Sequence, residues 1–242
     1  MEMTKPLITV ITVVYNDVSN IEQTILSVIN QIYPNLEYII IDGGSTDGTV
    51  DVIKKYVNRL AYWISEPDKG IYDAMNKGVR KAKGKWVNFM NSGDLFASND
   101  AVERIFNAKI NDDIKVIYGS VFLKKNGKRI LQKPFPICRI SNHMSFCHQA
   151  SFTRTDSVHF DLTYKIVADY KLFYDLYNSF GKTAFLCNEN IVVAIYECEN
   201  GVSSKQGRIC FYENLMVSSK AKNLRWYYNY VKAHINDLLK RW

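Results

Sequence analysis

Residues 7–14 read LITVITVV, an apolar run rich in β-branched side chains, and this stretch decides the fold class. A strand that is apolar on both faces is typical of a sheet covered by helices on either side. Turn-forming residues follow at positions 15–19, and apolar residues then recur at helical spacing from Ile21 to Ile32. A second apolar run, residues 36–41, comes directly after Pro34 and Asn35. The chain therefore begins strand, helix, strand, which predicts a parallel sheet.

The same alternation extends to about residue 106. We expect helices at 49–56, 72–82 and from 101 to 106, and strands at 61–65 and 86–90. Polar, glycine-rich turns follow the second, third and fourth strands: Asp42-Gly43-Gly44-Ser45, Asp68-Lys69-Gly70 and Asn91-Ser92-Gly93-Asp94. Ligands of parallel α/β sheets bind in the crevice at the carboxyl ends of the strands, so these turns are expected to share one rim.

The pattern changes at Val116. Residues 116–124 and 128–132 flank Asn126-Gly127, which predicts a β-hairpin. Residues 133–153 are expected to be irregular, followed by a helix at 169–180 and strands at 184–186 and 191–196. The basic, aromatic residues 201–242 are predicted to form a helical extension. We therefore divide the chain into a main domain, 1–200, with halves 1–115 and 116–200, and an extension, 201–242.

Composition limits the possible functions. The 242 residues are 47% hydrophobic and 23% charged, with a net charge of +7, and their five cysteines show no close pair. The cysteine count argues against a disulfide framework or zinc cluster, and we find neither a membrane-span run nor a secretion signal, which favours the cytoplasm. Positive charge suits nucleotide phosphates, nucleic acid or an anionic membrane. The charge is diffuse and no nucleic-acid recognition motif occurs, so nucleic acid is not expected as a partner.

Asp42 and Asp94 are the carboxylates of greatest interest in the first half. Asp42 could accept hydrogen bonds from a base or ribose, or its turn could simply be structural. Asp94 could hold Mg²⁺ or Mn²⁺ against a diphosphate, or belong to an ordinary β-turn. Asp68 is placed to touch base or ribose, and Lys77 to approach phosphate. Neither a phosphate-binding Walker loop nor a dinucleotide fingerprint is present.

The second half supplies two further candidates. Asp169 opens a predicted helix, where it could be a cap or the general base that removes a proton from an attacking hydroxyl. His148 and its neighbour Gln149 could bind an acceptor molecule, although a lone histidine is more often structural.

Taken in order, these stretches resemble the family 2 glycosyltransferases, which have the GT-A fold. The matching segments run to about residue 200 and are Ile8 to Asn16, Ser27 to Gln31, Glu37 to Thr49, Asn76 to Gly84, Phe89 to Phe96 and Ala168-Asp169-Tyr170. Residues 65–76, SEPDKGIYDAMN, resemble a subgroup associated with bacterial capsule, O-antigen and exopolysaccharide assembly. The resemblance implies an α/β, Rossmann-like three-layer sandwich with a mixed, mainly parallel sheet and additional C-terminal helices.

The resemblance also implies a role for each candidate. The half 1–115 would bind the nucleotide-sugar, preferably a UDP-sugar, and the half 116–200 a glycan or lipid-linked glycan acceptor. Asp169 would be the catalytic base of an inverting transfer, Asp94 the ligand of Mg²⁺ or Mn²⁺, and His148 with Gln149 the acceptor contact. The expected nucleotide-sugar contacts are Val13, Val14, Tyr15, Asp42, Asp68, Lys77, Asn91 and Ser92. Residues 201–204 resemble a segment that closes over donor phosphates.

Two departures from the family pattern keep a rival open. The family usually has Asp where this chain has Asn91 and Gly93, and Glu where it has Ala168. A non-catalytic module that binds a nucleotide-sugar or a glycan is therefore the alternative. A sugar nucleotidyltransferase would need a basic glycine-rich loop after the first strand, and Tyr15-Asn16-Asp17 is not one. The basic, aromatic tail suits either a peripheral membrane contact or packing in the protein, including a homodimer.

Overall fold

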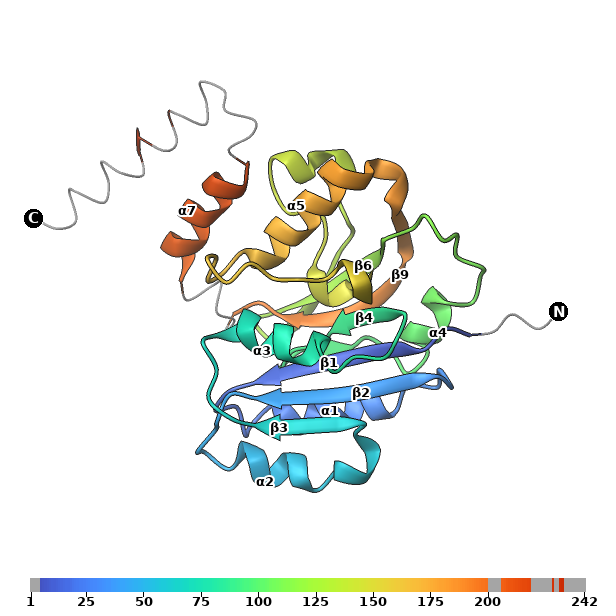
Figure 1. Cartoon of the computed structure of the whole chain (residues 1–242), viewed down its shortest axis with the longest axis vertical. Coiled ribbons are helices and arrows are strands. Elements are labelled where there is room, and N and C mark those ends of the chain that lie inside the picture. The colour runs from blue at the N-terminus through green and yellow to red at the C-terminus, as the bar shows by residue number, and fades with distance from the viewer. Residues whose placement is uncertain (1–4, 200–205, 219–227, 229–230, 233–242) are drawn as a thin grey trace, which may run out of the picture.

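The computed structural model describes residues 5–199, 206–218, 228 and 231–232 (Figure 1). Its first half alternates strands and helices as expected. The elements are β1 (Ile8–Val14), α1 (Ile21–Ile29), β2 (Leu36–Asp42), α2 (Thr49–Lys54), a 3-10 turn η1 (Val57–Arg59), β3 (Tyr62–Ser65), α3 (Ile71–Val79) and β4 (Trp86–Phe89). The four strands are parallel and lie in the order β3-β2-β1-β4. Strands β2 and β3 are therefore added on one side of β1, and β4 is added on the other side.

The second half completes the same sheet. Its elements are β5 (Leu95–Phe96), α4 (Ala101–Ile105), β6 (Val116–Lys125), β7 (Lys128–Gln132), η2 (Ile137–Ser141), η3 (His148–Ala150), β8 (Ser151–Arg154), η4 (Thr155–Ser157), α5 (Ala168–Phe180), η5 (Lys182–Ala184), β9 (Phe185–Glu197) and α7 (Gly207–Val217). The sheet runs β3-β2-β1-β4-β8-β6-β9-β5, and β7 pairs with β6. Strand β8 is antiparallel to both β4 and β6, whereas β9 is parallel to β6. The sheet is therefore mixed, with a parallel first half.

Two expectations about the second half were wrong. The segments 184–186 and 191–196, expected as separate strands, belong apart from Ala184 to the single strand β9, and β8 includes the last three residues of the segment 133–153, which was expected to be irregular. The polar residues between the two apolar pieces of β9 bulge where the register with β6 shifts at Gly119–Val121. Gly119 permits this close approach, because a Cβ there would lie 2.5 Å from the carbonyl oxygen of Ile191. Strand β8 is only four residues long, too short to show a clear period in the sequence.

Apolar side chains fill both faces of the sheet. On one face Ile11 and Ile39 pack with Met75 of α3 and Phe173 of α5. On the other face Ile8, Val10 and Ile40 pack with residues of α1, α2 and α4. This arrangement confirms the predicted three-layer α/β sandwich, because consecutive residues of β1 and β2 are buried against opposite helical layers.

Helix α7 lies beside α5 (Figure 1) and fixes the segment that leads into it. The carboxylate of Glu213, which is 8% exposed, accepts hydrogen bonds from the backbone N–H groups of residues 165, 166 and 167. Most of the expected tail beyond residue 218, and the 201–204 segment, lie outside the described residues. Within the described residues, no helix is both long enough and apolar enough to cross a membrane.

Candidate functional site

The carboxyl ends of β1, β2 and β4 meet at the point where strand order reverses. The Val14 carbonyl accepts a hydrogen bond from Gly43 N at 2.9 Å, and the Val13 carbonyl accepts one from Ser92 N at 3.2 Å. Val13 and Val14 are buried, whereas Tyr15 is 65% exposed. The backbone of β1 therefore ties the two neighbouring turns into one rim, with the Tyr15 ring open to a ligand. The carboxyl ends of strands at such a reversal point are where α/β sheets bind nucleotides.

Asp42 is fully buried at the end of β2 and holds its own loop. Its Oδ2 accepts from Gly44 N, Ser45 N and the Ser65 hydroxyl, and its Oδ1 accepts from the Ser45 hydroxyl at 2.5 Å. These contacts support the structural interpretation of Asp42, in which its carboxylate stabilises the turn that follows β2. Any contact with a base or ribose would use a carboxylate that already accepts four hydrogen bonds.

Asp68 and Tyr15 flank Gly43 on the same rim. A Cβ at Gly43 would lie 2.6 Å from Asp68 Oδ2 and 3.3 Å from Tyr15 Cδ2, so only glycine allows these two side chains to lie this close to the loop. The other Asp68 oxygen accepts from Gly70 N at 2.7 Å. Lys77 braces this loop: its ammonium pairs with Glu66 at 2.8 Å and donates to the Pro67 carbonyl at 2.9 Å. Asp68 Oδ2 therefore lies next to Gly43, between the loop that follows β2 and the loop that follows β3.

The turn after β4 is anchored by a residue that sequence reasoning did not select. The Ser92 hydroxyl donates to Asp17 Oδ2 at 2.6 Å, and Asp17 N donates to the Thr49 hydroxyl. Asn91 Oδ1 is buried and has no hydrogen-bond partner, which leaves an amide oxygen available to a ligand. Asp17 follows β1 by three residues, so its place after a buried strand was the available signal.

Asp94 turns into the protein. It is 4% exposed, and its oxygens accept from Gln149 Nε2 at 2.9 Å and from Glu197 N at 3.0 Å. Burial raises the pKa of this carboxyl to about 7. Gln149, expected to contact an acceptor, therefore clamps Asp94 and joins η3 and the end of β9 to the turn after β4.

The side chains around the turn after β4 can be compared with the oxygen ligands that Mg²⁺ or Mn²⁺ requires. The described residues contain no group of three or more His, Cys, Asp or Glu side chains that could hold a metal ion. The described side chains therefore cannot complete the coordination shell of the cation by themselves. Hard oxygens remain in the unpartnered Asn91 Oδ1 and in Asp94, whose oxygens each accept one bond and keep a lone pair. The residues fit a cation that is held mainly by substrate phosphates.

His148 and Asp169 form a close pair. His148 Nδ1 lies 3.0 Å from Asp169 Oδ2, and His148 Nε2 lies 3.4 Å from Asn91 Nδ2. Asp169 Oδ1 also accepts from Tyr170 N at 2.8 Å and from the Tyr72 hydroxyl at 3.0 Å. Burial alone would raise the pKa of Asp169, but the His148 contact and these two hydrogen bonds together hold it below its ordinary value. Nothing in the sequence singled out Tyr72, which reaches Asp169 from α3.

The candidates are joined by successive contacts rather than spread over separate surfaces. The Asp42 loop reaches β1 through Ser45, whose hydroxyl accepts from Asn16 N at 2.7 Å. Asp17 joins that loop to Ser92, and the next residue, Asn91, contacts His148. His148 in turn contacts Asp169 through Nδ1. One continuous network therefore links β1, β2, the turn after β4, η3 and α5.

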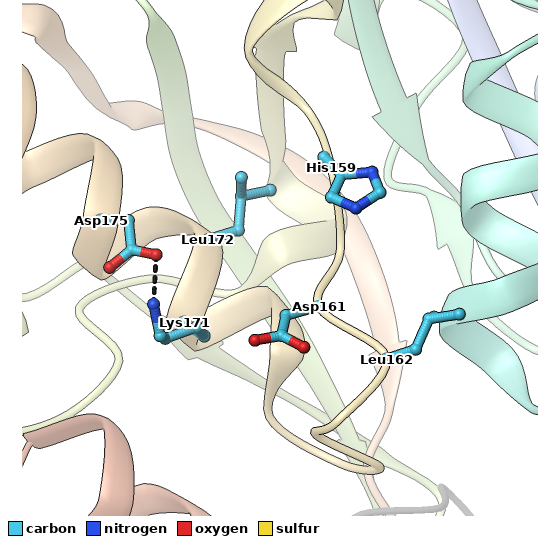
Figure 2. A pocket seen from close by; sticks show the side chains of 6 residues that line it. All are labelled: His159, Asp161, Leu162, Lys171, Leu172 and Asp175. Carbon is cyan, nitrogen blue, oxygen red and sulfur yellow. Dashed lines mark hydrogen bonds and ion pairs between the residues drawn. The ribbon is translucent and has the colours of Figure 1, made fainter.

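A separate pocket of about 460 Å³ lies between α5 and the loop that contains residues 159–162 (Figure 2). Lys171, Leu172 and Asp175 of α5 line it together with His159, Asp161 and Leu162, and Lys171 pairs with Asp175. None of the predicted site residues lines this pocket. The candidate site is therefore the network at the strand ends.

The arrangement is that of a GT-A glycosyltransferase fold, and solved structures agree. The chain is similar to S. aureus TarS in complex with UDP-GlcNAc, with a TM-score of 0.70 and 17% identity over 88% of this chain and 65% of that one. It is also similar to the mannosyltransferase PcManGT from Pyrobaculum calidifontis in complex with GDP-Man and Mn²⁺, with a TM-score of 0.69 and 16% identity over 96% of this chain and 70% of the other.

The family follows from sequence comparison. The model of Glycosyl transferase family 2 matches residues 9–176, and the chain belongs to this family. A relative described as an uncharacterized glycosyltransferase of Mycobacterium tuberculosis (strain ATCC 25618 / H37Rv) is 34% identical over 173 residues. That alignment covers 68% of this chain and 66% of the relative, so the chain spans just under two thirds of that protein's length.

Proposed function

We propose that this protein transfers a sugar from a nucleotide-diphosphate sugar to an acceptor hydroxyl, with inversion at the anomeric carbon. The observation that carries the proposal is the contact network that joins the strand ends of the nucleotide half to Asp169 and His148 of the second half. One side of this network offers an open ring and an unpartnered amide oxygen to the donor, and the other offers a fixed carboxylate and imidazole to the acceptor.

The donor would lie along the rim formed by β1, β2 and the turn after β4. The exposed side chain of Tyr15 and Asp68 Oδ2, which both lie close to Gly43, would contact the base and ribose. Lys77 would then contribute by bracing the Asp68 loop, because its amine already pairs with Glu66. Asn91 and Ser92 would face the diphosphate and sugar. The family match and the UDP-GlcNAc in the TarS structure support a nucleotide-sugar, and UDP is the nucleotide we expect.

Inversion in one step requires attack from the face opposite the nucleotide. The acceptor oxygen bonds to the anomeric carbon while the bond to the diphosphate breaks, and the acceptor proton must leave as the new bond forms. Asp169 supplies the negative charge that favours this proton removal, from the side of the network away from the donor rim. A divalent cation bound with the donor would neutralise the charge developing on the leaving diphosphate. The Mn²⁺ in the PcManGT complex supports this cofactor.

Replacement of the Asp169 carboxylate tests the catalytic role. We expect Asp169→Asn to lower the rate of nucleotide release from UDP-sugars by about 10²–10⁴-fold, because general-base assistance is lost. Donor affinity, measured by thermal shift, should change little, since Asp169 lies away from the donor rim. The matched control is Asp175→Asn, six residues further along α5, which should keep the wild-type rate. Unchanged turnover in Asp169→Asn would remove this residue from the mechanism.

A non-catalytic nucleotide-sugar or glycan-binding module is the second candidate. The observations that favour it are the missing carboxylates at Asn91 and Gly93 and the burial of Asp94. The same assay separates the two functions: a binding module shows donor-dependent thermal shifts but no nucleotide release with Mn²⁺ present.

We base the proposed cellular role on residues 65–76, which resemble a subgroup of family 2 glycosyltransferases. This resemblance favours a role in capsule, O-antigen or exopolysaccharide assembly, with a glycan or lipid-linked glycan as acceptor. A peripheral membrane contact through the C-terminal tail and a homodimer remain predictions for residues that lie mostly outside the described part of the chain.

A further inference from the structure

The hydroxyl of Tyr72 lies between two oxygen atoms, one at the start of α5 and one in the segment that precedes it. It is 2.5 Å from the carbonyl oxygen of Ile166 and 3.0 Å from Asp169 Oδ1. Tyr72 itself is the second residue of α3. One buried side chain of the nucleotide half therefore contacts both the proposed base and the backbone that leads to it.

The ring of Tyr72 is fixed in place by its packing. It lies against Phe160, with ring centroids 5.3 Å apart and planes tilted by 31°. Asn76, four residues further along α3, holds the backbone of Phe160: its Nδ2 donates to the Phe160 carbonyl at 2.8 Å and its Oδ1 accepts from Phe160 N at 2.9 Å. All three residues are at most 6% exposed. Because the ring cannot swing away, the hydroxyl has a defined position relative to α5.

This hydroxyl has one proton and two acceptors within reach. Burial, and to a lesser degree the negative charge of Asp169, raise the pKa of Tyr72 well above its ordinary value, so the hydroxyl keeps its proton. An ionised Asp169 attracts that proton to Oδ1, because a hydrogen bond to a charged acceptor is stronger than one to a neutral carbonyl. When Asp169 is neutral, the nearer carbonyl of Ile166 becomes the better acceptor.

The two oxygens of Asp169 differ in the hydrogen bonds that they already accept. Oδ1 accepts from Tyr170 N at 2.8 Å and from the Tyr72 hydroxyl, which together occupy both of its lone pairs. Oδ2 lies 3.0 Å from His148 Nδ1, its one hydrogen-bond partner in the described part of the chain. Burial opposes ionisation of Asp169, but these contacts hold its pKa below the ordinary value. At neutral pH Asp169 is therefore a carboxylate with a lone pair left on Oδ2.

We propose that Tyr72 is a positioning residue, which holds Asp169 Oδ1 and leaves Oδ2 to take the acceptor's proton. This inference rests on the proposed function and adds one residue to it. In the step, the acceptor oxygen bonds to the anomeric carbon, the bond from that carbon to the diphosphate breaks, and the nucleotide diphosphate leaves with the electron pair. The acceptor proton passes to Oδ2, and the Tyr72 hydroxyl turns its own proton to the Ile166 carbonyl. Asp169 later releases the proton to water, and the hydroxyl turns back.

A rotating hydroxyl suits this role better than a fixed donor would. A fixed donor favours only the ionised carboxylate and opposes its protonation. The Tyr72 proton has an acceptor in either state of Asp169, either the carboxylate or the Ile166 carbonyl. The position of that carbonyl is itself fixed, since Ile166 N donates to Glu213 Oε2 at 2.8 Å.

The test removes the hydroxyl and leaves the ring. Tyr72→Phe keeps the contact with Phe160, and Tyr72→4-aminophenylalanine replaces the hydroxyl by an amine with N–H donors. The matched control is Tyr33→Phe. Tyr33 is another buried tyrosine, and its hydroxyl donates at 2.7 Å to the backbone carbonyl of Pro6, before β1 and at the end of the sheet opposite the candidate site. Tyr72→Phe is also combined with Asp169→Asn.

The assay measures UDP release by the full-length protein with Mn²⁺ over a range of donor concentrations, with water as the acceptor. The donor is whichever of UDP-glucose, UDP-galactose and UDP-N-acetylglucosamine gives the largest thermal shift. Thermal melting shows that each variant is folded before its rate is compared.

We expect Tyr72→Phe to lower kcat by about 10- to 100-fold, because a displaced carboxylate removes the proton less well, and to leave the donor KM within about twofold of wild type. Combined with Asp169→Asn, the same substitution should change kcat by less than about twofold, since the carboxylate that it positions is absent. The amine at position 72 should recover most of the lost rate. Tyr33→Phe should melt at a lower temperature, as Tyr72→Phe does, but keep the wild-type kcat.

A wild-type kcat in Tyr72→Phe would overturn the inference. So would an equal loss in the presence and absence of Asp169→Asn, because the hydroxyl would then act without the carboxylate. A folded Tyr72→4-aminophenylalanine variant with a kcat below about a tenth of wild type would also overturn it, and this comparison stands even if Tyr72→Phe does not fold. If the wild type releases UDP from no donor, the proposed function itself fails, which is a different result from these three.

Discussion

At the scale of single residues, Asp94 makes a prediction about pH. Burial raises its pKa to about 7, whereas an unfolded chain has an aspartate pKa of about 3.9. Between these values the folded state binds more protons, so this carboxyl stabilises the protein fully below about pH 4. Its contribution is lost as the pH rises through 7, at a rate of at most about 1.4 kcal/mol per pH unit.

The isosteric neutral variant Asp94→Asn removes this dependence. Gln149 can turn its amide over to accept from the new side-chain amide. We therefore expect its melting temperature, relative to the wild type, to rise by several degrees between pH 5 and pH 8. Asp51→Asn, on an exposed face of α2, is the control. A constant difference from wild type across this pH range would contradict a buried, proton-binding Asp94.

Residue-scale prediction from sequence identified the rim but not how its side chains are used. Asp42, Asp94 and Asp169 were selected because each follows a strand or opens a helix, and the contact network joins all three regions. Spacing along the chain does not reveal which oxygen already has a partner: Asp42 holds its loop and Gln149 holds Asp94. The His148–Asp169 contact joins residues 21 positions apart through packing of α5, which no local pattern encodes.

At the scale of elements, α7 positions α5 through one side chain. Glu213 accepts the three consecutive N–H groups that precede α5, and its removal would leave these donors without a partner in a largely buried site. Glu213→Ala should cost about 1–3 kcal/mol and lower the melting temperature by several degrees. The rate should also fall, since Asp169 follows this segment by two residues, while donor affinity stays close to wild type.

Glu213→Gln, which keeps one carbonyl oxygen as an acceptor, should retain part of the lost stability. Melting curves and rates of the two variants check this order. Equal stability of Glu213→Ala and wild type would show that α7 does not hold the start of α5.

The parallel β1–β4 unit was predictable because long apolar runs and helical spacing are local signals. Strands β8 and β5 were not, because strands of four and two residues carry no period and exist only through pairing with β4, β6 and β9. Strand β9 was divided in two because its bulged middle is polar. Element prediction was thus reliable for segments that a helix covers and poor for those that depend on distant partners.

At the scale of the whole molecule, the cation should bind together with the nucleotide rather than before it. The described part of the chain holds no group of three or more His, Cys, Asp or Glu side chains that could hold a metal ion, and the turn after β4 offers the cation only Asn91 Oδ1 and the remaining lone pairs of Asp94. Donor phosphates must then complete the coordination shell, as is common for Mg²⁺ at phosphate sites. In calorimetry, MnCl₂ alone should give no saturable binding below about 1 mM. UDP should bind at least tenfold more tightly with Mn²⁺ than with EDTA, a gain of about 1.4 kcal/mol or more. Tight Mn²⁺ binding without nucleotide would show that the protein forms a complete cage, and equal UDP affinity with EDTA would show that the fold neutralises the diphosphate by its own groups.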